Sequence, residues 1–285
     1  MTVSNAARAD ELLRWIDAQP QALGHGWLEE LEERKREEAE FHDGDRAGRR
    51  DESPESTPNR RFYEAAGVVQ SAVADRLDSL VPGAVLLDFA CGNGRQTIAA
   101  ARKGASLALG IDISETSVQN ATEAAAEAGV GQVARFLQRD CENTGLPEAA
   151  FDVCLCSGML HHLDLTRGFP ELHRILAPGG RILCVEALAY NPFIRLYRTL
   201  TPSLRTEWER RHILGLRQLE YARQWFRVEN VRFFLLAAPL ATLLPAGPVR
   251  RAGLRLGHAL DAVATRTPLL KYWSWMFTFE LVKAD

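Results

Sequence analysis

Two glycines follow a short apolar segment in the run from Leu86 to Arg95, and this run contains residues that could hold a ligand. Gly92 and Gly94 lack a Cβ, so the backbone can turn tightly there and a ligand can lie against its amide groups. Amide groups that are aligned at the start of a helix favour a negatively charged group nearby. Turns of this kind lie at the carboxyl end of the first strand of an open α/β sheet, where nucleotide-like ligands bind.

An acid after the next apolar segment narrows the choice of ligand. Asp112 follows the segment 106–111, and it lies 112 − 88 = 24 residues after Asp88. This separation is one β-α-β unit and is close to the roughly 20 residues at which an acid reaches the hydroxyl pair of a ribose. We therefore predict a ligand that contains adenosine.

NAD and S-adenosylmethionine (SAM) are the two adenosine cofactors to compare. Counted from Gly92, the dinucleotide pattern G-x-G-x-x-G needs a small residue at Thr97, and threonine is a poor substitute for a glycine that permits close helix packing. NAD is therefore the weaker alternative. The run from Asp88 to Gly94 instead resembles the first motif of class I SAM-dependent methyltransferases, with Ala90 where the family usually has glycine.

Three later runs extend this resemblance over residues 86–186. Residues 139–141 (Arg-Asp-Cys) end the third strand, residues 151–163 resemble the fourth-strand motif of small-molecule methyltransferases of the ubiquinone-biosynthesis type, and residues 176–183 resemble the turn before strand five. The resemblance implies an enzyme that uses SAM, releases S-adenosylhomocysteine and needs no metal. It implies cofactor contacts by Asp88, Ala90, Cys91, Gly92, Gly94, Asp112, Ile113, Asp140, Cys141, Ser157 and Tyr63.

The resemblance also implies how some of these side chains act. Asp140 would receive the exocyclic amine of adenine, because a carboxylate accepts hydrogen bonds and does not donate them. Tyr63 would lie on a helix that covers the cofactor, although simple packing is an alternative. His161 and His162 follow strand four on the expected acceptor side, where an imidazole could remove a proton as a general base. The alternative is that one histidine only shapes the pocket.

Strand-like and helical segments alternate through the core of the chain, residues 84–187. This pattern predicts an α/β fold with a doubly wound, Rossmann-like class I methyltransferase sheet. Further along, 195–217 reads as a helix, 225–234 as a sixth strand, and 272–283 as a terminal strand inserted antiparallel. The five core strands are expected at residues 84–89, 106–111, 133–138, 151–157 and 181–186.

The domain organisation is predicted from the distribution of charge and from the positions of glycine and proline. Residues 1–60 form a helical N-terminal arm with a flexible linker at 42–59, and 61–285 form the methyltransferase domain, with a substrate-cover insertion at about 190–268. The helix expected at 28–41 is intensely charged and has little apolar face. It is therefore either solvated or packed on something outside its own domain, as a lid or as an arm that joins a homo-oligomer.

Composition excludes several classes of function. The chain of 285 residues has a net charge of −3, which gives no general reason to expect nucleic acid. Its arginine-rich segment 195–255 is better explained as an amphipathic cover than as an RNA site. Its five cysteines lack paired zinc spacing, which favours reduced thiols and a cytoplasmic location. The apolar segment 233–244 is interrupted by Pro239, so we expect no membrane span.

These observations predict methyl transfer to an apolar, lipophilic small molecule in specialised metabolism. One alternative is carbon methylation of a prenyl or terpenoid chain that triggers cyclisation, where aromatic faces could stabilise a carbocation. A second alternative, from another class, is a non-catalytic SAM-binding or assembly protein.

Overall fold

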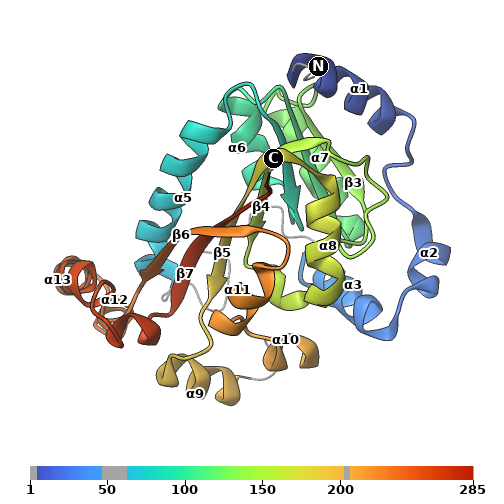
Figure 1. Ribbon diagram of the computed structural model, residues 1–285. Coiled ribbons are helices and arrows are strands. Elements are labelled where there is room, and N and C mark those ends of the chain that lie inside the picture. Colours follow the sequence, from blue (N-terminus) through green and yellow to red (C-terminus); the bar gives the residue numbers. More distant parts are fainter. Residues whose placement is uncertain (1–4, 47–62, 202–205, 285) are drawn as a thin grey trace.

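Seven strands form one mixed sheet between helices in the computed structural model, which describes residues 5–46, 63–201 and 206–284 (Figure 1). The order across the sheet is β3-β2-β1-β4-β5-β7-β6; β1 to β5 are parallel, and β7 is antiparallel to both of its neighbours. The strands are β1 (Val85–Phe89), β2 (Leu107–Asp112), β3 (Ala134–Gln138), β4 (Phe151–Ser157), β5 (Leu176–Ala187), β6 (Arg227–Phe234) and β7 (Met276–Val282). This architecture confirms the doubly wound sheet and the antiparallel insertion of the last strand.

Helices cover both faces of the sheet because the central strands are apolar on both sides. Successive residues of β1 point to opposite faces: Leu87 packs in one cluster with Leu12 of α1, and Leu86 packs in another with Leu77 of α5. The helices and single turns are α1 (Asn5–Asp17), α2 (Gly24–Glu30), α3 (Glu33–Arg46), η2 (Glu64–Ala66), α5 (Gly67–Leu80), α6 (Arg95–Arg102), α7 (Glu115–Glu127), η3 (Leu160–His162), α8 (Leu165–Ile175), α9 (Pro192–Leu200), α10 (Glu207–Arg211), α11 (Leu216–Ala222), α12 (Ala238–Ala241), α13 (Pro248–Ala264) and η5 (Leu270–Trp273).

The arm differs from the sequence prediction. The helix expected at 28–41 is two helices, and α3 continues through Gly44 to Arg46, into the segment that we assigned to the linker. Residues 47–59 of that linker lie outside the described residues. The solvated alternative is wrong, and the alternative of packing outside its own segment matches the structure, because α3 contacts α7 and makes ion pairs with acids of the segment 61–285.

Two elements near the end of the chain are also shorter than predicted. The helix expected at 195–217 is interrupted, since α9 ends at Leu200 and α10 is a separate helix of one turn. The terminal strand begins at Met276 and not at Tyr272, because residues 270–273 form a single 3-10 turn. All five cysteines are buried, and none of them is in a disulfide bond. Within the described ranges, none of the helices has the length and apolar character needed to cross a bilayer.

Candidate functional site

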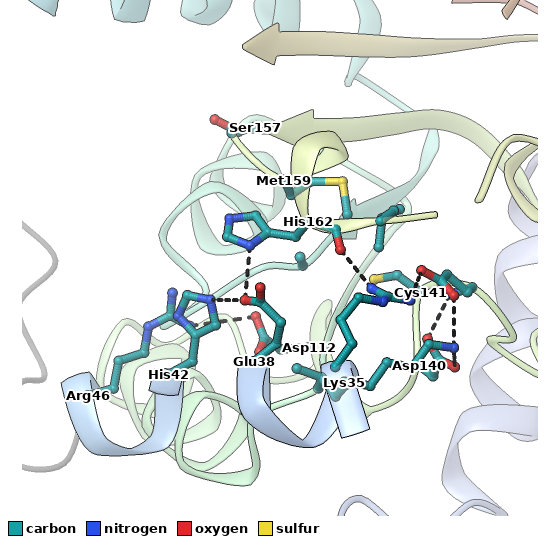
Figure 2. Close-up of a pocket in the computed structure, with 16 residues that line it drawn as sticks. Lys35, Glu38, His42, Arg46, Asp112, Asp140, Cys141, Ser157, Met159 and His162 are labelled. Atoms are coloured by element: carbon teal, nitrogen blue, oxygen red, sulfur yellow. Dashed lines mark hydrogen bonds and ion pairs between the residues drawn. The ribbon is translucent and has the colours of Figure 1, made fainter. Parts of the chain in front are cut away.

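A cavity opens at the carboxyl edge of the sheet between β1 and β4, where the strand order reverses and open α/β sheets bind ligands. It encloses about 140 Å³, less than the roughly 300 Å³ of a small-molecule pocket. The cavity is small because α3 lies across its mouth and sends polar side chains into it (Figure 2). The α3 residues that line it are Arg34, Lys35, Glu38, His42 and Arg46.

The glycine turn lies next to this site, and only Ala90 at its start lines the cavity. Gly92 donates its N–H to the Asp112 Oδ2 at 2.8 Å, so the turn is tied to the end of β2. Gly94 has a φ of +78°, and a Cβ there would lie 2.7 Å from the Ala121 Cβ and from the ring of Phe136. Ala90 also adopts a left-handed φ of +63°, which explains why glycine suits this position better.

The two acids of the first β-α-β unit have different surroundings. Asp88 is 3% exposed, accepts a hydrogen bond from the Thr97 hydroxyl at 2.8 Å, and does not line the cavity. Thr97, whose size counted against NAD, thus anchors this carboxylate behind the turn. Asp112 lines the cavity, and the Arg46 guanidinium of α3 lies 3.6 Å from its Oδ2. Its other oxygen accepts the Ser114 N–H at 3.0 Å.

Asp140, at the end of β3, is also held by α3. Its Oδ2 accepts a hydrogen bond from the Lys35 Nζ at 2.7 Å, and its Oδ1 accepts the Glu142 N–H at 2.9 Å. Burial alone would lower the pKa of Lys35, but hydrogen bonds to Asp140 and Glu142 outweigh burial and raise it. Each acid expected to bind adenosine therefore has a basic α3 side chain beside it.

Of the two adjacent histidines after β4, His162 faces the cavity. Its Nδ1 lies 3.0 Å from the Glu38 Oε2, and its second nitrogen points away from Glu38 (Figure 2). Burial and the neighbouring His161 lower the pKa of His162, which favours the neutral imidazole. Burial would raise the pKa of Glu38, but hydrogen bonds with His162 and His42 hold it well below its usual range. The Thr206 hydroxyl donates to the other Glu38 oxygen.

His161 has a different environment and does not line the cavity. Its Nδ1 lies 2.7 Å from the Glu186 Oε2, and its Nε2 lies 3.7 Å from the Glu209 Oε1. Burial would lower the pKa of His161, but these two carboxylates outweigh burial and raise it to about 9. The ring is therefore an imidazolium near neutral pH and cannot accept a proton, which argues against the predicted base role of His161.

The structure brings together only part of the predicted site. The predicted residues that line the cavity are Ala90, Asp112, Ile113, Asp140, Cys141, Ser157 and His162. The predicted residues that do not line it are Asp88, Cys91, Gly92, Gly94, Tyr63 and His161. Cys91 is buried, and its N–H donates to the Ile111 carbonyl at 2.8 Å. The Tyr63 ring packs on Trp275 with centroids 5.7 Å apart, which matches the packing alternative.

The segment expected to cover the substrate, residues 190–268, has two parts that lie in different places. Trp208 of α10 stacks under the Arg34 guanidinium at 4.5 Å, and Glu209 reaches His161, so α10 supports the histidine cluster. The described residues from 237 to 268 do not line the cavity, contrary to our prediction for that part of the insertion.

Two groups of side chains have the spacing to hold a metal ion. One ligand atom each from Glu38, His42 and His162 lies within 4.8 Å of the others, and the same is true of His161, His162 and Glu209. Sequence reasoning missed the α3 contributors to this site. A signal was available, because Arg34, Glu38, His42 and Arg46 recur every four residues and so share one helix face.

Comparison with known proteins shows similarity to methyltransferases. Residues 87–184 match the model of a methyltransferase domain. The chain is 36% identical over 114 residues to 27-O-demethylrifamycin SV methyltransferase of Amycolatopsis mediterranei, which covers 39% of this chain and 42% of that protein. It is 31% identical over 120 residues to demethylmenaquinone methyltransferase of Symbiobacterium thermophilum, covering 41% and 47%. The matched region thus spans less than half of either relative.

Solved structures extend the likeness beyond the matched segment. Magnesium protoporphyrin IX methyltransferase from Synechocystis superposes with a TM-score of 0.59 at 17% identity, over 88% of this chain and all of that one. Geranyl diphosphate C-methyltransferase from Streptomyces coelicolor gives 0.58 at 17% identity, over 89% and 98%. At this identity the likeness concerns the fold alone.

Proposed function

Because residues 87–184 form a class I SAM-dependent methyltransferase domain, we propose that the protein transfers a methyl group from SAM to an apolar small-molecule acceptor. The observation that carries this proposal is the convergence of Asp112, Asp140 and His162 on one cavity from the ends of three different strands. The match to a methyltransferase domain favours this reaction over an NAD-dependent one.

The residues that line the cavity fit an adenosine sulfonium. The Asp112 carboxylate would accept the ribose hydroxyls, and the Asp140 carboxylate would accept the adenine amine. Both acids now contact α3, through Arg46 at 3.6 Å and Lys35 at 2.7 Å. We therefore expect cofactor binding to exchange or share these two ion pairs. When bound, SAM supplies an electrophilic methyl group.

His162 is the best candidate for a proton acceptor in the described site. A carboxylate only accepts hydrogen bonds, so the contact with Glu38 requires the proton of the neutral ring to be on Nδ1. The Nε2 lone pair then remains available to remove a proton from an acceptor hydroxyl as the methyl group is transferred. Glu38 would hold the ring in place and stabilise the imidazolium that forms. The remaining demands of methyl transfer are alignment and exclusion of water.

The nature of the cavity wall supports an apolar acceptor with an ionisable hydroxyl. Met159, Leu163 and Ile113 give the cavity an apolar wall near His162. The curated relatives act, by their names, on a rifamycin precursor and on demethylmenaquinone. Carbon methylation of a prenyl chain is less well supported, because the described residues that line the cavity include no Phe, Tyr or Trp to stabilise a carbocation.

Calorimetric titration with S-adenosylhomocysteine tests the cofactor site. Asp112→Ala should weaken binding, whereas Asp78→Ala, a matched change at an exposed ion pair with Lys103, should not. His162→Ala should keep its affinity and lose turnover. Equal affinity in Asp112→Ala and in the wild-type protein would show that the site is misplaced.

Labelled SAM and a panel of acceptors test the reaction itself. The panel should contain hydroquinones, phenolic polyketides and prenyl diphosphates, with products identified by mass spectrometry. We expect the label on oxygen of a hydroxylated acceptor. Label on carbon of a prenyl chain would favour the alternative reaction, and tight SAM binding without any turnover would favour a non-catalytic role.

A further inference from the structure

An unusually apolar surface lies on the helical hairpin α12–α13, at the end of the sheet away from α3 (Figure 1). In the described chain, most exposed large apolar side chains belong to residues 190–200 or 240–273. Those of the second segment are Leu240, Leu243, Leu244, Val249, Leu256, Leu260, Val263, Leu269, Leu270 and Trp273. Because this hairpin does not line the cavity, the cofactor site does not explain its composition.

The apolar side chains of α13 form a stripe that points away from the protein. Val249, Leu256, Leu260 and Val263 follow one another at intervals of seven, four and three residues, which places them on one helix face. They are more than half exposed, and Val263 reaches 70%. A single helix face of this kind normally packs against something apolar.

The face of α13 beside this stripe is fixed in place. A Cβ on Gly257 would lie 2.6 Å from the Ala238 Cα, so the two helices of the hairpin are in close contact there. The buried Asp261 carboxylate accepts backbone N–H groups from residues 236, 237 and 238. The helix therefore cannot turn its apolar stripe inward without breaking these contacts.

The charge on this part of the chain indicates what the stripe contacts. Between residues 230 and 279 the sequence contains five arginines and one lysine, and its single acid is the buried Asp261. Arg255 and Arg266 are exposed next to the stripe. The whole chain has a net charge of −3, so positive charge is concentrated here. An exposed apolar face flanked by arginine is typical of helices that lie in the interface of an anionic membrane.

We propose that the α12–α13 hairpin docks the protein on the surface of an anionic lipid bilayer. The stripe of Val249, Leu256, Leu260 and Val263 would enter the boundary between headgroups and acyl chains, and Arg255 and Arg266 would contact lipid phosphates. A second copy of the chain fits less well, because a two-fold contact through this face would bring the arginines of the two copies together, and the exposed Glu64 is already paired with Arg250. Docking would let the protein take up an apolar acceptor from the bilayer. Only this uptake rests on the proposed function, and the docking itself does not.

Sedimentation with lipid vesicles tests the proposal. Wild-type protein should sediment with vesicles of phosphatidylcholine and phosphatidylglycerol and remain in solution with phosphatidylcholine alone. Leu256→Glu/Val263→Glu and Arg255→Glu/Arg266→Glu should each reduce the bound fraction at least tenfold. Arg217→Glu/Arg223→Glu, which makes the same charge change on exposed residues in α11 and directly after it, is the control and should bind like the wild type.

The affinity for S-adenosylhomocysteine and the oligomeric state are also measured for each variant. Affinity for S-adenosylhomocysteine in each variant shows that it is folded, and it keeps a failure of docking distinct from a failure of the proposed function. Absence of wild-type binding to anionic vesicles, or equal binding by the α13 variants, would overturn the proposal. Dimers that form without vesicles and dissociate in Leu256→Glu/Val263→Glu would instead assign the face to a second copy of the chain. Binding to RNA without binding to anionic vesicles would assign the face to nucleic acid.

Discussion

Replacement of Gly94 by alanine measures how strongly packing holds the turn after β1. A left-handed conformation costs an alanine about 1–2 kcal/mol. The new Cβ would also lie 2.7 Å from the Ala121 Cβ and from the Phe136 ring, and overpacking of this kind costs about 1–3 kcal/mol. We therefore expect Gly94→Ala to lower the free energy of unfolding by roughly 2–5 kcal/mol, the sum of the two costs.

Two other glycines separate these costs. Gly104 has a φ of +87° with nothing within 4 Å of a built Cβ, so Gly104→Ala carries only the backbone cost. Gly110 has no left-handed φ, but its Cβ would lie 2.7 Å from Phe136 and 2.8 Å from the Cys91 Sγ, so Gly110→Ala carries only the packing cost. If the reasoning holds, the loss in Gly94→Ala is close to the sum of the other two losses.

Urea unfolding followed by circular dichroism gives the three free energies, and calorimetry with S-adenosylhomocysteine reports on the turn in the folded protein. Phe136→Leu in the Gly94→Ala background should recover part of the lost stability, because it removes the ring that the new Cβ meets. The packing argument is refuted if Gly94→Ala is no less stable than Gly104→Ala.

Three further outcomes follow from the histidine cluster. Glu38→Gln should lower kcat about a hundredfold with unchanged S-adenosylhomocysteine affinity, because the base loses its carboxylate partner; an unchanged kcat would exclude the dyad. The raised pKa of His161, about 9 against 6.5, adds stability that is fully present below pH 6.5 and lost as the pH rises through 9. His161→Gln should therefore lower the free energy of unfolding by about 3 kcal/mol at pH 6, with a gap that narrows between pH 6.5 and pH 9 and closes above pH 9 in a urea series. Dialysis against EDTA should leave turnover intact, because Glu38 and His162 already hydrogen-bond to each other. A loss that one divalent ion restores, with matching metal content by mass spectrometry, would contradict this.

Local sequence pattern was enough to place the sheet. The strand expected at 151–157 is β4 residue for residue, because a short, mostly apolar run flanked by turn residues has few other structures available to it. Asp112 and Asp140 could be assigned to one edge because the carboxyl ends of parallel strands meet there. Gly94 does not line the cavity, and the structure gives it a packing role against β3 and α7 that the sequence did not indicate.

The role of α3 could not be predicted in the same way. Lys35 contacts Asp140 and Glu38 contacts His162, more than a hundred residues along the chain in each case. The four-residue recurrence of α3 shows that its polar side chains share a face, but it does not show which remote residues that face meets, so a charged helix that covers a site looks the same as a charged helix in solvent.

The sequence by itself determined the sheet, its switch point and the family motifs, because each depends on apolar periodicity and on glycine and acid residues at strand ends. Tertiary structure alone decided which of two adjacent histidines can act as a base. His161 meets Glu186 of β5 and Glu209 of α10, whereas His162 meets Glu38 of α3 beside the cavity. The protonation of an imidazole is set by the charges and the burial around it, and in this protein those come from elements far apart in the chain.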